Sequence, residues 1–180
     1  MTQSIYIIRH AQAMGQEPEA PLTTVGKQQA ENLAAFLNEY PIDRLIASPF
    51  IRAVGTVEPY AKQYGKQIEV ERRIGEGLIK SEQYPAWLTH LGDLFPNISL
   101  NAIESSSPTD KRDRAINAIN DIIEHPSQHT AIVSHGGIIP ILFHHFGYGA
   151  AFTRLTNPDV HLLTIDEQNN STIERIWQPQ

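Results

Sequence analysis

Short apolar runs separated by amphipathic stretches are the main pattern along the chain. The run from Ile5 to Ile8 is rich in β-branched residues, which predicts a buried strand. Similar runs occur in the segments IDRLIASP and TAIVSHGG. Asn169-Asn170 indicates a turn between two apolar segments near the end of the chain. The expected strands are therefore residues 5–8, 42–48, 68–70, 130–135, 160–165 and 172–177.

Between these runs, apolar residues recur every three or four positions, as is typical of amphipathic helices. One helix is expected to begin at Thr24, with Thr23 or Thr24 as its N-cap. Another is expected to open at Pro49, an allowed first-turn position. Further helices are predicted for Tyr84–Leu94, for SSSPTDKRDRAINAINDIIE and for IIPILFHHF. In the SSSPTDK helix, the expected inner side comprises Ala115, Ile116, Ile119, Ile122 and Ile123.

Strands that alternate with helices predict the α/β class. Such chains build a mostly parallel central sheet with helices on both faces. The chain has 180 residues, enough for one domain with a substantial core. No internal repeat, low-complexity tract or linker divides the sequence, so one domain spanning residues 1–180 is expected.

Composition narrows the classes of partner. The formal charge of −6 argues against general attraction to nucleic acid or to an anionic membrane, so an anion would have to be captured by a local pocket. The absence of cysteine removes disulfides, thiol nucleophiles and cysteine metal sites. The first residues, MTQSIYIIRH, lack the pattern of a secretory signal, and no long apolar segment suggests a membrane span. A cytoplasmic location is the resulting expectation.

Polar residues follow three of the predicted strands. Arg9 and His10 end the first strand, Arg52 follows the second, and His135 ends the TAIVSHGG strand, where Ser134 and Gly136 flank it. In open α/β sheets, ligands bind beyond the carboxyl ends of the strands. Two permanently charged arginines that converge there would repel one another unless an anion lay between them, and the guanidinium fork matches phosphate oxygens. A phosphate pocket is therefore predicted.

Each of these residues has a simpler interpretation when taken alone. A single histidine at a strand end is usually structural or solvated. Arg52 on an amphipathic helix would more often be a solvated or ion-paired arginine. The Ser134–Gly137 segment could be only a tight turn. The coincidence of three strand ends favours the phosphate pocket over these separate explanations.

Four segments in order along the chain, IIRHAQ, PLTTVG, ASPFIRAVGT and AIVSHGG, resemble the motifs of the histidine phosphatase superfamily, also called phosphoglycerate mutase-like. The resemblance extends from Ile5 to about Ile139. It implies a phosphoglycerate mutase-like fold, a covalent phosphohistidine mechanism, and no metal or other cofactor. It also implies that His10 is the nucleophile and that Arg9, Arg52 and His135 hold the phosphoryl oxygens.

The resemblance also implies a carboxylic acid after the third strand that protonates the leaving group. Glu76 lies between two glycines in RRIGEGLIK, and its spacing resembles the Leu-x-Glu pattern of the family, with Ile74 in the leucine position. An exposed loop glutamate is the alternative interpretation. Glu71 is the nearest rival for the acid.

Several positions depart from the pattern of the family. Ala11 follows the nucleophile where glycine is usual, which would cost roughly 1 kcal/mol if the position needed a positive φ. Gln12 stands where many members have Glu or Gln. Gln16 stands where many mutases have Asn and is a candidate phosphate contact. In AIESSS, Glu104 and Ser105 resemble a weaker Gly-Glu-Ser motif.

Other histidines raise the question of a metal site. His144, His145 and His161 are close in sequence to one another or to the last strands, but no carboxylate accompanies them at helical spacing. Solvated or packed histidines are therefore expected. The four motif segments also offer no carboxylate to a divalent cation.

The short segment between Glu76 and Glu104, and the short tail after Trp177, favour an open pocket that water can reach. Because a mutase must protect its phosphoenzyme from water, these features favour a phosphatase that acts on a small phosphorylated metabolite. A phosphohistidine protein phosphatase is an alternative, because PLTTVG, SPFIRA and the C-terminal segment also resemble that branch. A cofactor-dependent phosphoglycerate mutase and a non-catalytic phosphate-ester-binding protein remain open, as does the oligomeric state.

Overall fold

The computed structural model describes residues 1–99, 107–149 and 154–179. The strands are β1 (Gln3–Arg9), β2 (Arg44–Ala47), β3 (Ile68–Val70), β4 (His129–Ser134), β5 (Asp159–Ile165) and β6 (Ser171–Trp177). The helices are α1 (Thr24–Leu37), α2 (Ile51–Tyr64), α3 (Tyr84–Leu94), α4 (Lys111–Glu124) and α5 (Ile139–His145), with a 3₁₀ turn, η1, at Arg72–Ile74.

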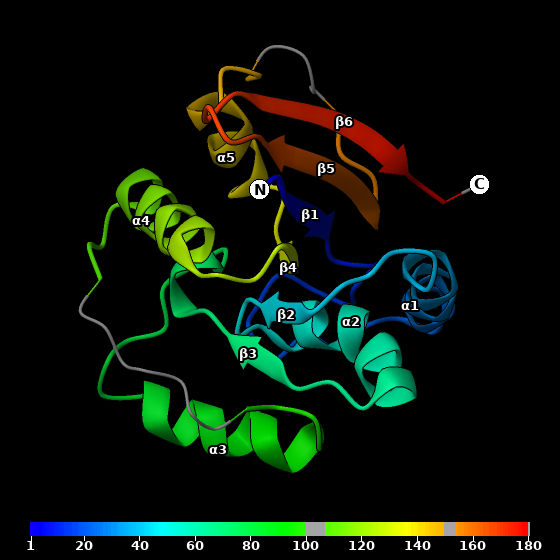
Figure 1. Ribbon diagram of the computed structural model, residues 1–180. Helices are drawn as coiled ribbons and strands as arrows, with labels where there is room; N and C mark the ends of the chain where they lie inside the picture. The colour runs from blue at the N-terminus through cyan, green and yellow to red at the C-terminus, as the bar shows by residue number, and fades with distance from the viewer. Residues whose placement is uncertain (100–106, 150–153, 180) are drawn as a thin grey trace.

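The strands form one sheet in the order β3-β2-β4-β1-β5-β6. The first four strands of this order are parallel to their neighbours, whereas β5 pairs antiparallel with both β1 and β6. Helices cover both faces, with α1 and α2 on one side and α4 and α5 on the other (Figure 1). The expected α/β class with a mostly parallel central sheet is confirmed.

Strand β1 shows how the sheet separates two apolar layers. Tyr6 and Ile8 face the layer that also contains Leu33 of α1 and Val54 of α2. Ile5 and Ile7 face the opposite layer, against α4 and α5. Successive side chains of a strand point to opposite faces, so a continuous apolar run is what a strand with two buried faces requires.

The helix boundaries confirm one expectation and correct two others. Thr23 is the N-cap of α1, and its side chain accepts a hydrogen bond from the Gly26 amide at 2.9 Å. Helix α2 begins at Ile51 with Phe50 as its N-cap, so Pro49 precedes the helix instead of opening it. On α4 the buried face is Arg114, Ala115, Ala118, Ile119 and Ile122, while Ile116 and Ile123, expected inside, are only half-buried.

The parallel register brings three strand ends to one edge of the sheet. Arg9 pairs with Ser134 and Ala47 pairs with Val133, so the next residues of β1, β2 and β4 lie side by side. The His10 amide continues the ladder by donating to the Ser134 carbonyl at 3.1 Å. The predicted convergence of strand ends is thus a direct result of the register.

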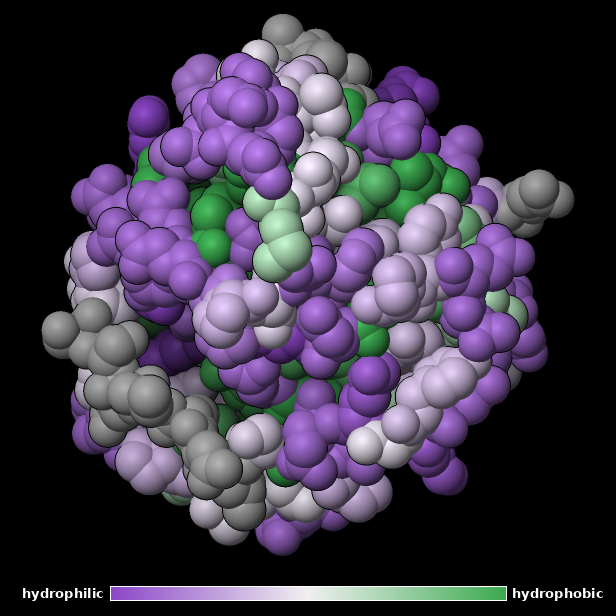
Figure 2. Space-filling view, viewed as in Figure 1, coloured by the Kyte–Doolittle hydropathy of each residue, from purple (hydrophilic) through white to green (hydrophobic). Residues whose placement is uncertain are grey.

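The outer surface is mainly hydrophilic in the view of Figure 2, with hydrophobic residues showing in recesses, among them one between β3 and α3. Helix α3 packs there through Leu91, which is fully buried, and through Trp87 and Leu88, which are partly buried. Among the described helices, none combines the length and the hydropathy that crossing a bilayer requires.

Candidate active site

His10 directly follows β1 and is held by a contact to each ring nitrogen. Its Nδ1 lies 2.7 Å from the Ala11 carbonyl oxygen, which can only accept a hydrogen bond, so Nδ1 carries the proton. Its Nε2 lies 3.2 Å from Nε of Arg52, which can only donate, so Nε2 holds a lone pair. These two contacts select the neutral tautomer with a nucleophilic Nε2.

The surroundings of His10 keep it neutral. Burial lowers the pKa of its imidazole to about 4, and the positive charges of Arg52 and Arg9 act in the same direction. The Ala11 carbonyl acts in the opposite direction, because it accepts a hydrogen bond from the protonated ring. At neutral pH the imidazole therefore needs no proton acceptor before it can attack.

Arg52 lies in the first turn of α2, which points its side chain back toward the strand ends. The side chain is only 1% exposed, so the interpretation of Arg52 as a solvated surface arginine is wrong. Its Nη1 donates to the Glu17 carbonyl at 2.9 Å, which fixes the guanidinium beside His10. No carboxylate among the described residues forms an ion pair with it, so its charge is available to an anion.

Arg9, the last residue of β1, supplies a second guanidinium. Its Nη1 donates to the Leu155 carbonyl at 2.8 Å, and its buried Nε has no hydrogen-bond partner among the described residues. A Cβ on Gly136 would lie 3.1 Å from Nη2 of Arg9, so glycine at this position lets the guanidinium pack closely against the chain after β4.

His135 lies behind His10, with 5.1 Å between the two ring centroids. Its Nε2 is 2.7 Å from the Ser48 hydroxyl, and its Nδ1 is buried without a partner among the described residues. Burial and the neighbouring His10 hold the pKa of His135 well below its usual value. The ring is 1% exposed and is not among the residues that line the cavity described next.

A cavity of about 360 Å³ opens over these side chains. The walls include His10, both arginines, Gln16 and Glu76, so the structure brings together five of the six residues predicted for the site. Its other lining residues are Gln12, Ala13, Gly136, Gly137 and Asn157. The cavity is polar and carries two permanent cations close to the Nε2 lone pair of His10.

Glu76, and not its rival Glu71, reaches the cavity. The Gly137 amide donates to Oε2 of Glu76 at 3.1 Å, and Lys111 Nζ lies 3.4 Å from Oε1. A Cβ on Gly137 would fall 2.0 Å from Oε1, so glycine leaves the space that the carboxylate occupies. Glu71 instead pairs with Arg73 at 2.6 Å.

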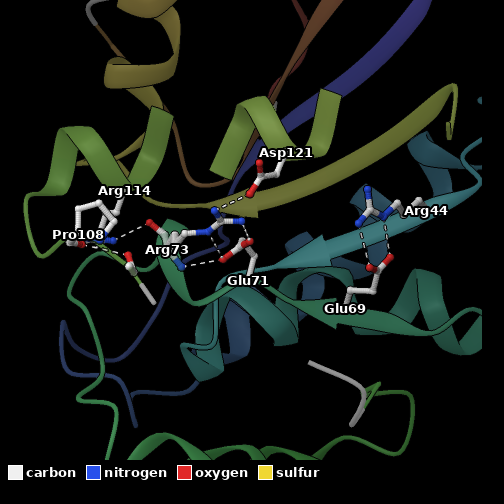
Figure 3. A network of polar contacts seen from close by, with 8 residues as sticks. Arg44, Glu69, Glu71, Arg73, Pro108, Arg114 and Asp121 are labelled. Atoms are coloured by element: carbon white, nitrogen blue, oxygen red, sulfur yellow. Dashed lines mark hydrogen bonds and ion pairs between the residues drawn. The ribbon is translucent and has the colours of Figure 1, made fainter. Parts of the chain in front are cut away.

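The loop that carries Glu76 is tied to α4 by Arg114, a residue that sequence reasoning missed. Nη1 of Arg114 donates to the carbonyls of Arg73 and Gly75, both at 2.7 Å, and Nη2 donates to the Glu76 carbonyl at 3.2 Å. The side chain is 2% exposed. Figure 3 shows Arg114 directed at this loop, beside the network in which Arg73 bridges Glu71 and Asp121.

Asn157 is a second residue that sequence reasoning missed. Its Nδ2 donates to the His10 carbonyl at 3.0 Å, and the side chain lines the cavity. The only local signal is an Asn-Pro dipeptide before β5, which indicates a turn and not a ligand contact.

The structure accounts for Ala11, which stands where the family usually has glycine. The only non-glycine residue with positive φ among those described is Asn169, so Ala11 needs no left-handed backbone. Ala11 is fully buried and its amide donates to the Thr56 hydroxyl at 2.8 Å. Gln12 accepts a hydrogen bond from the Thr23 hydroxyl at 2.8 Å. Glu104 and Ser105 lie outside the described residues.

The remaining histidines do not gather into a metal site in the described ranges. His144 and His145 are exposed on α5, whereas His161 is fully buried against Phe143 and lies 3.6 Å from Asp159. Across residues 1–99, 107–149 and 154–179, no three His, Cys, Asp or Glu side chains lie close enough together to hold a metal ion.

The fold and the site together define a phosphohydrolase-like α/β protein, and comparison with known families identifies the class. The sequence model of the histidine phosphatase superfamily (branch 1) matches residues 5–175. The chain therefore belongs to this superfamily. No curated protein matches the sequence.

Solved structures give the same fold. The chain is similar to a mycobacterial glucosyl-3-phosphoglycerate phosphatase, with 16% identity, a TM-score of 0.66, and coverage of 97% of this chain and 98% of the other. A mutant phosphoserine phosphatase from Entamoeba histolytica, bound to phosphoserine, matches at 16% identity and a TM-score of 0.66 over 95% of this chain and 94% of its own. The protein histidine phosphatase SixA, bound to tungstate, matches at 20% identity and a TM-score of 0.60 over 98% and 96%.

At these identities the structural likeness carries the fold alone. The superfamily, together with phosphatases among its structural relatives, supports a phosphoric monoester hydrolase.

Proposed function

We propose that this protein hydrolyses a small phosphomonoester without a metal, through a covalent phosphohistidine on His10. The observation that carries the proposal is the state of that side chain. It is neutral, its Nδ1–H is fixed on a carbonyl, and its Nε2 lone pair lies beside a cavity with two arginines. Phosphoryl transfer depends on alignment and charge neutralisation, and this arrangement supplies both.

In the first step, the Nε2 lone pair of His10 attacks phosphorus and the bond from phosphorus to the ester oxygen breaks. The carboxylic acid of Glu76 gives its proton to that oxygen, and the alcohol departs. As the phosphoryl group approaches, Nε of Arg52 exchanges its present acceptor, Nε2 of His10, for a phosphoryl oxygen. Arg9, which lines the same cavity, donates an N–H of its guanidinium to another phosphoryl oxygen.

In the second step, water attacks the phosphohistidine. The Glu76 carboxylate accepts a proton from this water, the P–N bond breaks, and inorganic phosphate and neutral His10 are released. His135, whose Nε2 contacts Ser48, is proposed to donate a hydrogen bond from its neutral ring to a phosphoryl oxygen, which requires its buried Nδ1 to come into contact with the cavity when phosphate binds. Gln16, at the rim of the cavity, is proposed as a further contact to the phosphate.

Labelling experiments test the nucleophile. His10→Ala should abolish both turnover of 4-nitrophenyl phosphate and the acid-labile label that wild type acquires from a phosphate donor. His145→Ala, which removes an exposed histidine from α5, is the matched control and should keep both. A label that persists in His10→Ala would remove His10 as the nucleophile. The absence of any label or turnover in wild type would favour a non-catalytic phosphate-ester-binding protein.

The identity of the acid is tested by the leaving group. Glu76→Gln should slow esters with poor leaving groups, such as glycerol phosphate, by about 10²–10³-fold, and 4-nitrophenyl phosphate far less. Glu71→Gln should show no such dependence on the leaving group, because Glu71 is engaged with Arg73. Equal losses for both esters in Glu76→Gln would contradict the assignment.

A phosphatase is favoured over a mutase and over a phosphohistidine protein phosphatase. The cavity that contains His10 is open to a second, larger space, which would not protect a phosphoenzyme from water. Glu76 at the cavity suits an ester, because a phosphohistidine leaving group depends less on a carboxylic acid. Phosphate release should exceed conversion of 3-phosphoglycerate to 2-phosphoglycerate in the presence of the bisphosphate, and EDTA should not affect it. Mutase flux well above phosphate release would contradict the assignment as a phosphatase. Inhibition by a chelator would contradict a metal-free reaction.

A further inference from the structure

A second cavity adjoins the phosphate cavity and is more than twice as large, at about 810 Å³ against 360 Å³. Gln16 and Glu76 line both, so they mark the boundary between the two spaces. The larger cavity is also lined by Glu19, Leu78, Ile79, Lys80 and Trp87. Because Glu76 stands at the junction, the larger cavity lies on the side where the leaving group of an ester would be placed.

The walls of this cavity are largely apolar, and Trp87 is the main aromatic surface. Its Nε1 donates to the Pro49 carbonyl at 2.8 Å, so the polar edge of the indole is already satisfied. The ring packs against the core layer of α1 and α2 and remains half-buried. Leu78 and Ile79, from the loop before α3, are half-buried and line the same cavity. A fixed aromatic face that shares a cavity with aliphatic side chains favours a flat, apolar ligand.

The charges around the larger cavity disfavour an anionic leaving group. Among the described residues, Lys80 is the only lysine or arginine that lines it, and its side chain is exposed and therefore strongly screened. Glu19 faces the same space, and Glu76, the proposed acid, contacts Lys111 outside it. A substrate carboxylate would therefore lose water there without gaining a net positive partner.

We propose that the larger cavity binds the alcohol portion of the substrate as an uncharged aromatic ring stacked on Trp87, so that the preferred substrates are aryl or arylalkyl phosphates. This inference rests on the proposed phosphatase function. It separates the protein from enzymes of the same fold whose substrates are phosphoserine or a phosphoglycerate derivative.

A substrate series tests the proposal by turnover. The value of kcat/KM should be about tenfold higher for 2-naphthyl phosphate than for phenyl phosphate, whose leaving groups are similar in acidity, and both should exceed phosphoserine and 3-phosphoglycerate. Trp87→Ala should remove the advantage of the naphthyl ester, and Trp87→Phe should restore most of it. Hydrolysis of acetyl phosphate, which has no ring, should change little in either variant.

A binding experiment separates failure of this inference from failure of the proposed function. In His10→Ala, calorimetry should show tighter binding of 2-naphthyl phosphate than of phosphoserine, and Trp87→Ala in that background should remove the difference. Equal binding, or a preference for phosphoserine, would overturn the aromatic assignment even if wild type hydrolyses acetyl phosphate. Aromatic preference in binding, with no hydrolysis of any ester by wild type, would support the cavity assignment and overturn the function.

Discussion

The imidazole of His10 is placed where protonation is unfavourable. Burial is the largest cause, and two guanidinium groups add to it. No carboxylate among the described residues is hydrogen-bonded to this ring. The Ala11 carbonyl accepts the Nδ1–H hydrogen bond that a carboxylate often accepts at catalytic histidines. In the role of nucleophile that we propose for it, His10 would therefore need no general base at neutral pH.

The first prediction concerns the titration of this side chain. Because the pKa of His10 is lowered to about 4, its ring resonances should titrate near that value in the free enzyme and not near 6.5. Arg52→Gln removes a neighbouring positive charge, so the pKa of His10 should rise in that variant. Heteronuclear NMR of imidazole nitrogens measures both. A wild-type titration midpoint near 6.5 would show that burial does not lower the pKa of the His10 imidazole.

Gly137 gives a second prediction at the residue scale. Gly137→Ala places a Cβ 2.0 Å from the present position of Oε1 of Glu76, so the carboxylate must move while the fold persists. Turnover of esters with poor leaving groups should fall by about tenfold or more, and 4-nitrophenyl phosphate should be affected less. Gly55→Ala, where the new methyl would meet only Leu22, is the control. Unchanged turnover in Gly137→Ala would show that the acid tolerates displacement.

At the scale of elements, helix α4 holds the loop of Glu76, the proposed acid, although none of its residues lines the cavity that contains His10. The guanidinium of Arg114 is shared among three carbonyls of the loop that carries Glu76. A lysine has one compact ammonium group and cannot match that fork. The loop conformation is therefore set by a buried cation on the neighbouring helix, which packs in the same apolar layer as Ile74.

Arg114→Lys tests this positioning role. The variant should lower kcat for poor leaving groups by roughly tenfold, with little change in KM and with 4-nitrophenyl phosphate nearly unaffected. Arg44→Lys, which alters the separate Arg44–Glu69 pair seen in Figure 3, should change neither. If Arg114→Lys lowered turnover of both classes of ester equally, the residue would be structural and not a positioning residue for the acid.

Most of the elements could be predicted because their patterns are local. The β-branched run of β1 and the threonine cap of α1 are visible within a few residues. The antiparallel pairing of β5 and β6 was not specified, because pairing direction depends on contacts between distant segments. The start of α2 was misplaced because both Pro49 and Phe50 can precede a helix.

The residues of the candidate site also include some that could be predicted from local sequence patterns and some that could not. The arrival of Arg9, His10 and His135 at one edge of the sheet could be predicted, since parallel strands bring their carboxyl ends together there, whereas the burial of His135 away from the cavity could not. Arg114 and Asn157 could not, because each acts through backbone carbonyls that are remote in sequence. Such contacts leave no spacing pattern, and a buried arginine on an amphipathic helix resembles a surface residue until its partners are known.

The whole molecule has an acid-sensitive core. The pKa values of His10 and His135 both lie below 6.5 in the folded state, so between about pH 4 and 6.5 the unfolded chain binds protons that the folded chain does not. The free energy of unfolding should therefore fall as the pH drops below 6.5. His10→Gln should reduce this slope by up to about 1.4 kcal/mol per pH unit in that window. Urea denaturation at several pH values measures it, and identical slopes in the variant would contradict the prediction.

The order of synthesis gives the central position of β1 a kinetic consequence. A ribosome delivers β1 more than 100 residues before either of its neighbours in the sheet, β4 and β5. At typical translation rates, His10 therefore waits on the order of 10 s for the strands that complete its surroundings. Nascent chains arrested before residue 129 should thus lack an assembled phosphate pocket, and activity should emerge late, after long-range pairing closes the sheet.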